Sequence, residues 1–181
     1  MPALFFRQVE RFGDRVALRY KEYGIWHRIS WRDYGRSVRE VAAGLLSLGV
    51  SPGEFVAVLG DNRPEWLYCH LGAMVAGGAT CGIYPTSAPE QLTYLLGHSE
   101  SKVLFVENEE QVDKVLQILP EVDLEQVIVW DPKGLWGFSH PKIIFFEEFM
   151  KRARGYLEAH PRCVEETMAA LGPDDTAMII Y

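Results

Sequence analysis

The residues best placed for chemistry are the hexapeptide Asp61-Asn62-Arg63-Pro64-Glu65-Trp66. They follow an apolar run that predicts a buried strand, and Pro64 is a favourable first residue of a helix. Ligands of open α/β sheets bind beyond the carboxyl ends of the strands, and free N–H groups at a helix start bind anions. The alternative is a crossover loop without function, in which Asn62 caps the helix. The sequence therefore predicts either an anion-binding loop or a well-capped turn.

Three other patterns that resemble catalytic motifs have structural explanations. Ser99-Glu100-Ser101-Lys102 fits S-x-x-K, but Lys102 begins a predicted strand, so the serine and lysine cannot share a helix face. Gly77-Gly78 lacks the spacing of a dinucleotide fingerprint and precedes a strand rather than a helix. The adjacent carboxylates of Asp174 and Asp175 suit a turn better than acid–base catalysis. None of these patterns predicts a catalytic residue.

The histidines and cysteines are scattered along the chain. His70 lies in the middle of a predicted helix and could line a ligand site, whereas His98 lies near a helix end, where the helix dipole accounts for it. The three widely spaced cysteines predict reduced thiols in a cytosolic protein and no zinc site. We therefore predict no catalytic residue and no metal ligand from these side chains, and we expect four arginines to be solvated: Arg7, Arg11, Arg15 and Arg19.

The composition limits the class of protein. The chain has 181 residues, of which 48% are hydrophobic and 24% charged, and this suits one globular domain rather than a disordered chain. The formal net charge of −7 gives no electrostatic footprint for nucleic acid. No apolar run is long enough to cross a bilayer.

The periodicity of apolar residues predicts strands that alternate with helices. The first part of the chain predicts a helix through Arg11, a hairpin of Val16–Tyr20 with Ile25–Ile29 around a turn at 21–24, and a helix capped by Ser30. Buried strands then follow at 55–59, 79–84, 102–106 and 126–130. Helices between them begin at Pro64, at Ser87 in a capping box with Glu90, and at Asn108. This order predicts a mostly parallel sheet.

The last third of the chain is less regular. Residues 131–141 predict a loop, 145–156 a helix, and 173–175 a turn. Residues 176–181 then predict a strand, and the chain ends within it at Tyr181. Because chain termini usually lie in polar, frayed segments, we expect this chain to be part of a longer protein.

Several segments together resemble one family. The segments Gly60–Trp66, Gly72–Ala79 and Ile83–Ser87 are similar to the opening domain of the AMP-forming acyl-activating (adenylate-forming) enzymes, and most similar to bacterial long-chain fatty acid–CoA ligases. The segments Ser30–Tyr34, Leu48–Gly53, Gln91–Leu96 and Ser99–Lys102 agree. The resemblance implies an α/β fold, a mostly parallel sheet with flanking helices, as in the N-terminal subdomain of an acyl-CoA synthetase. Residues 1–181 would be a partial N-terminal domain that ends before the phosphate-binding loop.

The resemblance also implies an activity for the full-length protein. A fatty acid would react with Mg-ATP to give acyl-AMP, and CoA would then displace AMP. ATP, Mg and CoA would be bound mostly outside this chain, with Tyr181 as the one cofactor-binding residue, next to the phosphate loop. The catalytic residues would lie downstream, so the fragment alone would be inactive. We expect the enzyme to be cytoplasmic and to be peripheral to the inner membrane.

Two alternatives from other functional classes stay open. The chain could be a self-contained flavodoxin-like module that binds a nucleotide or a partner without catalysis. It could also be an interaction domain that forms a homodimer through exposed apolar surface.

Overall fold

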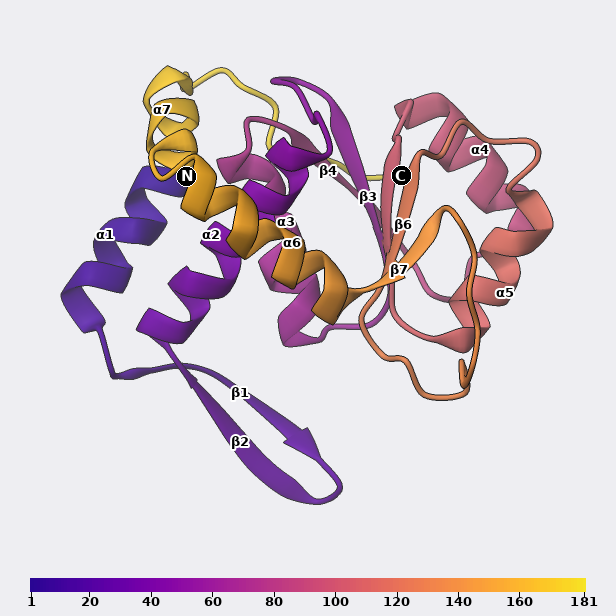
Figure 1. Cartoon of the computed structure of the whole chain (residues 1–181), viewed down its shortest axis with the longest axis horizontal. Coiled ribbons are helices and arrows are strands. Elements are labelled where there is room, and N and C mark those ends of the chain that lie inside the picture. Colours follow the sequence, from indigo (N-terminus) through magenta and orange to yellow (C-terminus); the bar gives the residue numbers. More distant parts are fainter.

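A six-stranded sheet forms the centre of the protein, and the computed structural model describes residues 1–181 (Figure 1). All neighbouring strands of this sheet are parallel. The predicted fold class, a mostly parallel α/β sheet with flanking helices, is therefore confirmed. In spatial order the strands are β7 (Ile143–Phe145), β6 (Gln126–Val129), β5 (Val103–Val106), β3 (Phe55–Leu59), β4 (Ala79–Ile83) and β8 (Met178–Ile179).

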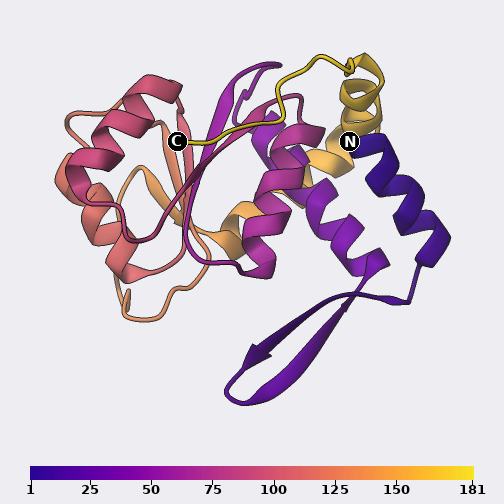
Figure 2. The same ribbon diagram turned by 180° about the vertical axis from the view of Figure 1, so that it is seen from behind.

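Seven helices accompany the strands. They are α1 (Pro2–Phe12), α2 (Trp31–Ser47), α3 (Pro64–Val75), α4 (Pro89–Ser99), α5 (Glu109–Ile118), α6 (Phe146–Ala159) and α7 (Cys163–Ala170). Helices α4 and α5 cover one face of the sheet, and the other helices lie on the opposite side (Figures 1 and 2). None of the helices combines the length and the apolar character needed to cross a bilayer.

Strand β3 shows how the sequence produces these layers. Successive side chains of a strand point to opposite faces, so a strand covered on both sides must be apolar throughout. Val56 and Val58 belong to the core cluster that includes α2, α3 and α6, while Ala57 and Leu59 belong to the cluster that includes α4 and α5. All four side chains are fully buried. The continuous apolar run predicted this strand with its observed bounds.

A separate antiparallel hairpin of β1 (Val16–Glu22) and β2 (Ile25–Ser30) projects from the body (Figures 1 and 2). The predicted four-residue turn at 21–24 is wrong, since the strands continue to a two-residue turn at Tyr23 and Gly24. Both residues have positive φ, 47° and 82°, as tight hairpin turns with the favoured twist require. The hairpin itself is confirmed, and both of its strands are longer than predicted.

Two predicted helix caps are confirmed and two are wrong. The Asp33 N–H donates to Ser30 Oγ at 3.0 Å, and the Gln111 N–H donates to Asn108 Oδ1 at 3.3 Å. Helix α3 instead follows Arg63, with no side-chain cap, so Asn62 is not its cap. Helix α4 follows Ala88 rather than Ser87, and the Ala88 N–H donates to Gln91 Oε1 at 2.9 Å. Pro89 and Pro64 fix these starts because proline suits the first turn of a helix.

The last third of the chain departs most from the prediction. Strand β7 and helix α7 were not predicted, because three strand residues next to a helix, and a helix of eight residues, give too little periodicity. The predicted strand at 176–181 is wrong in extent: only Met178 and Ile179 pair with β4, opposite Thr80 and Cys81. Ile180 is 80% exposed. The predicted helix at 145–156 is confirmed as α6, with shifted ends.

Candidate functional site

The carboxyl ends of β3, β4 and β8 meet at one edge of the sheet. Parallel pairing places Leu59 beside Ile83, so the loops that follow β3 and β4 leave the sheet side by side. A cavity of about 210 Å³, which we call the tip cavity, lies there. Its lining includes Gly60, Asn62, Trp66, Tyr84, Met178 and Tyr181. This is the edge at which open α/β sheets bind ligands.

A second cavity, the outer cavity, adjoins the first. It has a volume of about 440 Å³, and its lining includes Tyr84, Ser87, Glu90, Tyr94, Leu95 and Tyr181. Tyr84 and Tyr181 line both cavities. The walls are mainly aromatic and aliphatic, and no Cys, His, Lys or Arg side chain lines either cavity. These residues can bind a ligand, and they do not form the nucleophile–base pair that covalent catalysis needs.

Tyr181, the predicted cofactor-binding residue, lies at this edge. Its hydroxyl is 2.7 Å from His98 Nδ1, and its ring meets the His98 and Tyr94 rings edge-on. Partial burial raises the pKa of the Tyr181 hydroxyl. His98, predicted to serve only the helix dipole, therefore also orients Tyr181. Contact of Tyr181 with a cofactor stays a prediction.

The loop at 61–66 reaches the tip cavity through Asn62 and Trp66. The Asp61 N–H donates to Glu107 Oε2 at 2.7 Å, so a carboxylate already occupies this donor. Glu65 lies in the first turn of α3, with its carboxylate 3.8 Å from Arg63 Nε. Two carboxylates thus compete with any external anion at this helix start. The anion-binding interpretation stays untested, and the loop is a wall of the cavity.

Glu107 is the residue that sequence reasoning missed. It follows β5 directly and is 8% exposed, at the position where a buried strand ends. Gly60 packs closely against Glu107 and Trp130. A Cβ atom added at Gly60 would be 2.5 Å from Trp130 Cζ2 and 2.9 Å from Glu107 Cβ. Only glycine lets the three segments approach so closely. A charged residue directly after an apolar strand was the available signal.

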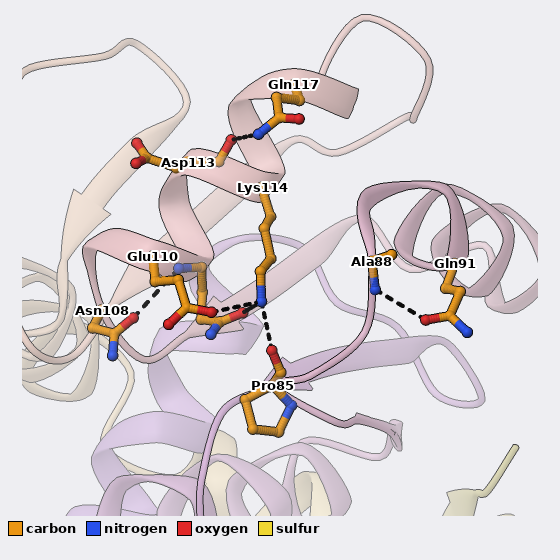
Figure 3. Close-up of polar contacts among 9 residues, drawn as sticks. Pro85, Ala88, Gln91, Asn108, Glu110, Asp113, Lys114 and Gln117 are labelled. Atoms are coloured by element: carbon orange, nitrogen blue, oxygen red, sulfur yellow. Dashed lines mark hydrogen bonds and ion pairs between the residues drawn. The ribbon is translucent and has the colours of Figure 1, made fainter.

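Lys114 fixes the loop that separates β4 from α4 (Figure 3). Its ammonium group donates to the Pro85 carbonyl oxygen at 2.6 Å and to Gln111 Oε1 at 3.2 Å, and it lies 2.9 Å from Glu110 Oε1. Only 17% of the Lys114 side chain is exposed. Charge-assisted hydrogen bonds are stronger than neutral ones, so α5 holds the wall of the outer cavity in place.

The remaining sequence candidates lie elsewhere. His70 Nδ1 is 3.0 Å from Thr80 Oγ1, its ring packs on Trp66, and it lines neither cavity. Burial lowers the pKa of His70. Asp175 Oδ2 accepts from the Gly172 N–H at 2.8 Å, which confirms its predicted role in a turn.

The structure also agrees with the non-catalytic explanations of the S-x-x-K pattern, of Gly77-Gly78 and of the four arginines. Ser99 Oγ is 2.8 Å from Ser101 Oγ, while Lys102 is exposed and lies 3.3 Å from Glu125, so no Ser–Lys pair forms. Gly77 has a φ of 86° at the turn before β4. The predicted solvated arginines are all exposed: Arg7, Arg11, Arg15 and Arg19.

The chain holds no group of three or more His, Cys, Asp or Glu side chains arranged to bind a metal ion.

Comparisons with known proteins agree with this architecture. The long-chain-fatty-acid–CoA ligase ACSBG1 of Homo sapiens is 34% identical over 179 residues, which are 98% of this chain and 24% of that protein. The corresponding ligase ACSBG2 of Homo sapiens is 30% identical over 181 residues, or 100% of this chain and 27% of that protein. This chain thus spans about a quarter of the length of these relatives.

Solved structures share the fold. The anthranilate CoA ligase AuaEII, in complex with anthranoyl-AMP, matches with a TM-score of 0.70 and 21% identity over 83% of this chain and 27% of that chain. A putative long-chain-fatty-acid CoA ligase from Rhodopseudomonas palustris matches with a TM-score of 0.68 and 17% identity over 99% of this chain and 38% of that chain. The model of one protein family, described as AMP-binding enzyme, matches residues 5–181. The chain therefore belongs to the AMP-binding enzyme family.

Proposed function

We propose that residues 1–181 are the first part of a fatty acid–CoA ligase. In the first step a carboxylate oxygen of the fatty acid attacks the α-phosphorus of ATP, the bond to the β-phosphate breaks, and acyl-AMP and pyrophosphate form. In the second step the CoA sulfur attacks the acyl carbon, the bond to AMP breaks, and a thioester forms. The match of the AMP-binding enzyme family to residues 5–181 is the observation that carries this proposal.

In this proposal the chain binds and positions substrates rather than reacting with them. Trp66, Tyr84 and Tyr181 provide the aromatic wall of the tip cavity at the carboxyl edge of the sheet. The phosphate-binding loop follows Tyr181, and the hydrogen bond to His98 orients the residue that precedes this loop. The magnesium ion, which would neutralise phosphate charge, is assigned to residues outside this chain.

Three finer features belong to the proposal. The preferred acid is long-chain, which the names of the relatives support at about 30% identity. The enzyme works in the cytoplasm and associates peripherally with the inner membrane. A homodimer stays a prediction, and light scattering tests it.

The test compares two proteins. The longer protein that contains residues 1–181 is expected to catalyse ATP–pyrophosphate exchange only when a fatty acid is added, with acids of different chain length giving the preference. The chain of residues 1–181 is the matched control and is expected to show no exchange. No exchange by the longer protein with any acid overturns the ligase proposal, and exchange by residues 1–181 overturns the assignment of catalysis to downstream residues.

A second candidate function is a nucleotide-binding module without catalysis. The order of the first five strands of the large sheet, β4-β3-β5-β6-β7, is that of flavodoxin-like sheets. Titration of residues 1–181 with AMP and FMN by calorimetry separates the two candidates. Saturable binding to the isolated chain favours the module, and heats no larger than those of dilution favour the ligase.

A further inference from the structure

Glu107 carries a buried carboxylate that has no cationic partner. The residue is 8% exposed, and it forms no ion pair within the chain. Its side chain makes one hydrogen bond, in which Oε2 accepts from the Asp61 N–H at 2.7 Å. Because burying a carboxylate costs free energy unless hydrogen bonds compensate for the lost water, this bond is the compensation that the structure provides. The contact with Asp61 therefore accounts for an acidic residue at this position.

The backbone of Glu107 is fixed from both sides. Its N–H donates to the Leu59 carbonyl oxygen at 3.0 Å, and its carbonyl oxygen accepts from the Asp131 N–H at 2.7 Å. These two bonds continue the parallel ladder of β3, β5 and β6 one residue beyond β5. The Glu107 side chain therefore starts from a rigid support, at the edge of the sheet where β3 ends.

The β3–α3 loop, residues 60–63, depends on this side chain. Within this chain, the bond from Asp61 to Glu107 is the only hydrogen bond that joins residues 60–62 to another segment. A further bond, from the Arg63 N–H to the Asp61 carbonyl oxygen at 2.7 Å, lies inside the loop. Gly60 permits the close contact, because an added Cβ would lie 2.9 Å from Glu107 Cβ. Without the Glu107 carboxylate, the loop is free to turn about Gly60.

The position of the loop matters for the tip cavity. Asn62 and Trp66 line this cavity, and both come directly after Asp61 in the chain. Consecutive Cα atoms are about 3.8 Å apart, so a fixed Asp61 N–H closely restricts the place of Asn62 and of the first turn of α3. Glu107 lines neither cavity, and its influence on the site passes through the loop.

We propose that Glu107 is a positioning residue of the ligase. By accepting the Asp61 N–H, its carboxylate holds Asn62 and Trp66 in the wall against which a substrate binds. The inference deepens the proposed function and rests on it. Catalysis requires bound groups to be held in a productive geometry, and small displacements of the positioning groups cost large factors in rate.

The first test is ATP–pyrophosphate exchange by the longer protein that contains residues 1–181. Glu107→Ala removes the acceptor, and Glu107→Asp keeps the charge but shortens the side chain by one methylene group. Both variants should lower kcat/KM by about tenfold, because the loop loses its restraint. Glu107→Gln keeps an oxygen acceptor at the same reach and should stay within about twofold of the parent.

A matched control removes a buried hydrogen bond at the opposite end of β5. Ser101 is 3% exposed, and its Oγ is 2.8 Å from Ser99 Oγ. Ser101→Ala should lower the stability and leave kcat/KM within about twofold of the parent. A loss in Ser101→Ala as large as that in Glu107→Ala would attribute both losses to stability alone. An equal loss in Glu107→Gln and Glu107→Ala would exclude the hydrogen bond as the cause, and either result overturns the proposal.

A second measurement does not depend on activity. Amide hydrogen exchange of residues 1–181, followed by NMR, should show a protected Asp61 N–H in the parent and in Glu107→Gln. The same N–H should exchange about tenfold faster in Glu107→Ala and Glu107→Asp. The Asp131 N–H bonds to the Glu107 backbone, so it should stay protected in every variant and show that the sheet is folded.

The two measurements separate failure of this inference from failure of the ligase proposal. An unprotected Asp61 N–H in the parent, or protection that is unchanged in Glu107→Ala, overturns the positioning role and leaves the ligase proposal intact. No exchange of pyrophosphate by the longer protein overturns the ligase proposal, and the positioning role with it.

Discussion

Strand β3 and the hairpin of β1 and β2 are held in opposite ways. Four of the five residues of β3 are buried, and helices cover both faces of the strand. No residue of the hairpin strands is buried, although their side chains include Leu18, Tyr20 and Trp26. An isolated two-stranded hairpin is at best marginally stable, so this one depends on its anchorage to the body. The stability of the chain is thus concentrated in the sheet.

The largest expected effect tests this difference directly. Phe105 on β5 is fully buried and meets the Phe149 ring edge-on at 5.4 Å. Phe105→Ala should lower the free energy of unfolding by about 3–5 kcal/mol, because it leaves a cavity in the core. Trp26→Ala in the hairpin should change it by no more than about 0.5 kcal/mol. Urea denaturation measures both, and equal losses would contradict the comparison.

A glycine pair gives the next largest difference. Gly60→Ala places a methyl group against Trp130 and Glu107 and should cost about 1–3 kcal/mol in the free energy of unfolding. Gly97 in α4 has nothing within 4 Å of an added Cβ, so Gly97→Ala should stabilise the protein by about 0.5 kcal/mol. Thermal melts of the two variants should shift in opposite directions. A higher Tm for both variants would contradict the close packing at Gly60, and a lower Tm for both would contradict the open space at Gly97.

Two asparagines sharpen the comparison between a capped and an uncapped helix. Asn108→Ala removes the side chain that caps α5 and should cost about 1 kcal/mol. Asn62→Ala removes a cavity-lining residue that caps nothing, and should change the free energy of unfolding by less than about 0.5 kcal/mol. Similar losses measured by urea denaturation would mean that Asn62 supports α3 after all.

The smallest effect is a pH dependence. Burial against the sheet lowers the pKa of His70 from its ordinary value of 6.5. As the pH falls below 6.5, the unfolded state therefore takes up a proton before the folded state does, and stability decreases. His70→Asn should flatten the dependence of Tm on pH between about 7 and 5, where the unperturbed imidazole titrates. An unchanged slope would show that His70 is protonated equally in both states.

The elements predicted best from the sequence are the strands that helices cover on both faces. The apolar runs at 55–59, 79–84, 102–106 and 126–130 correspond to four parallel strands, because each run must be apolar to lie between two helix layers. The caps at Ser30 and Asn108 were predictable because their polar atoms satisfy the first N–H groups of a helix. These features depend on neighbours in sequence or on burial alone.

The missed features depend on contacts between distant segments. Strand β7 forms only because β6 offers an edge beside residues 143–145. Glu107 gains its role from Asp61, and Tyr181 from His98, and no spacing in the sequence reports either pair. The predicted strand at 176–181 was too long because apolar composition does not show where pairing with β4 ends.

The bonds of Lys114 determine how stiff the entrance to the outer cavity is. The ammonium group has three protons, and three oxygen acceptors surround it, one from Pro85 and two from α5. The 84–88 segment cannot swing outward without breaking one of these bonds or pulling α5 with it. A ligand that needs a wider opening must therefore break the hydrogen bond between Lys114 and Pro85 or move α5 together with the segment.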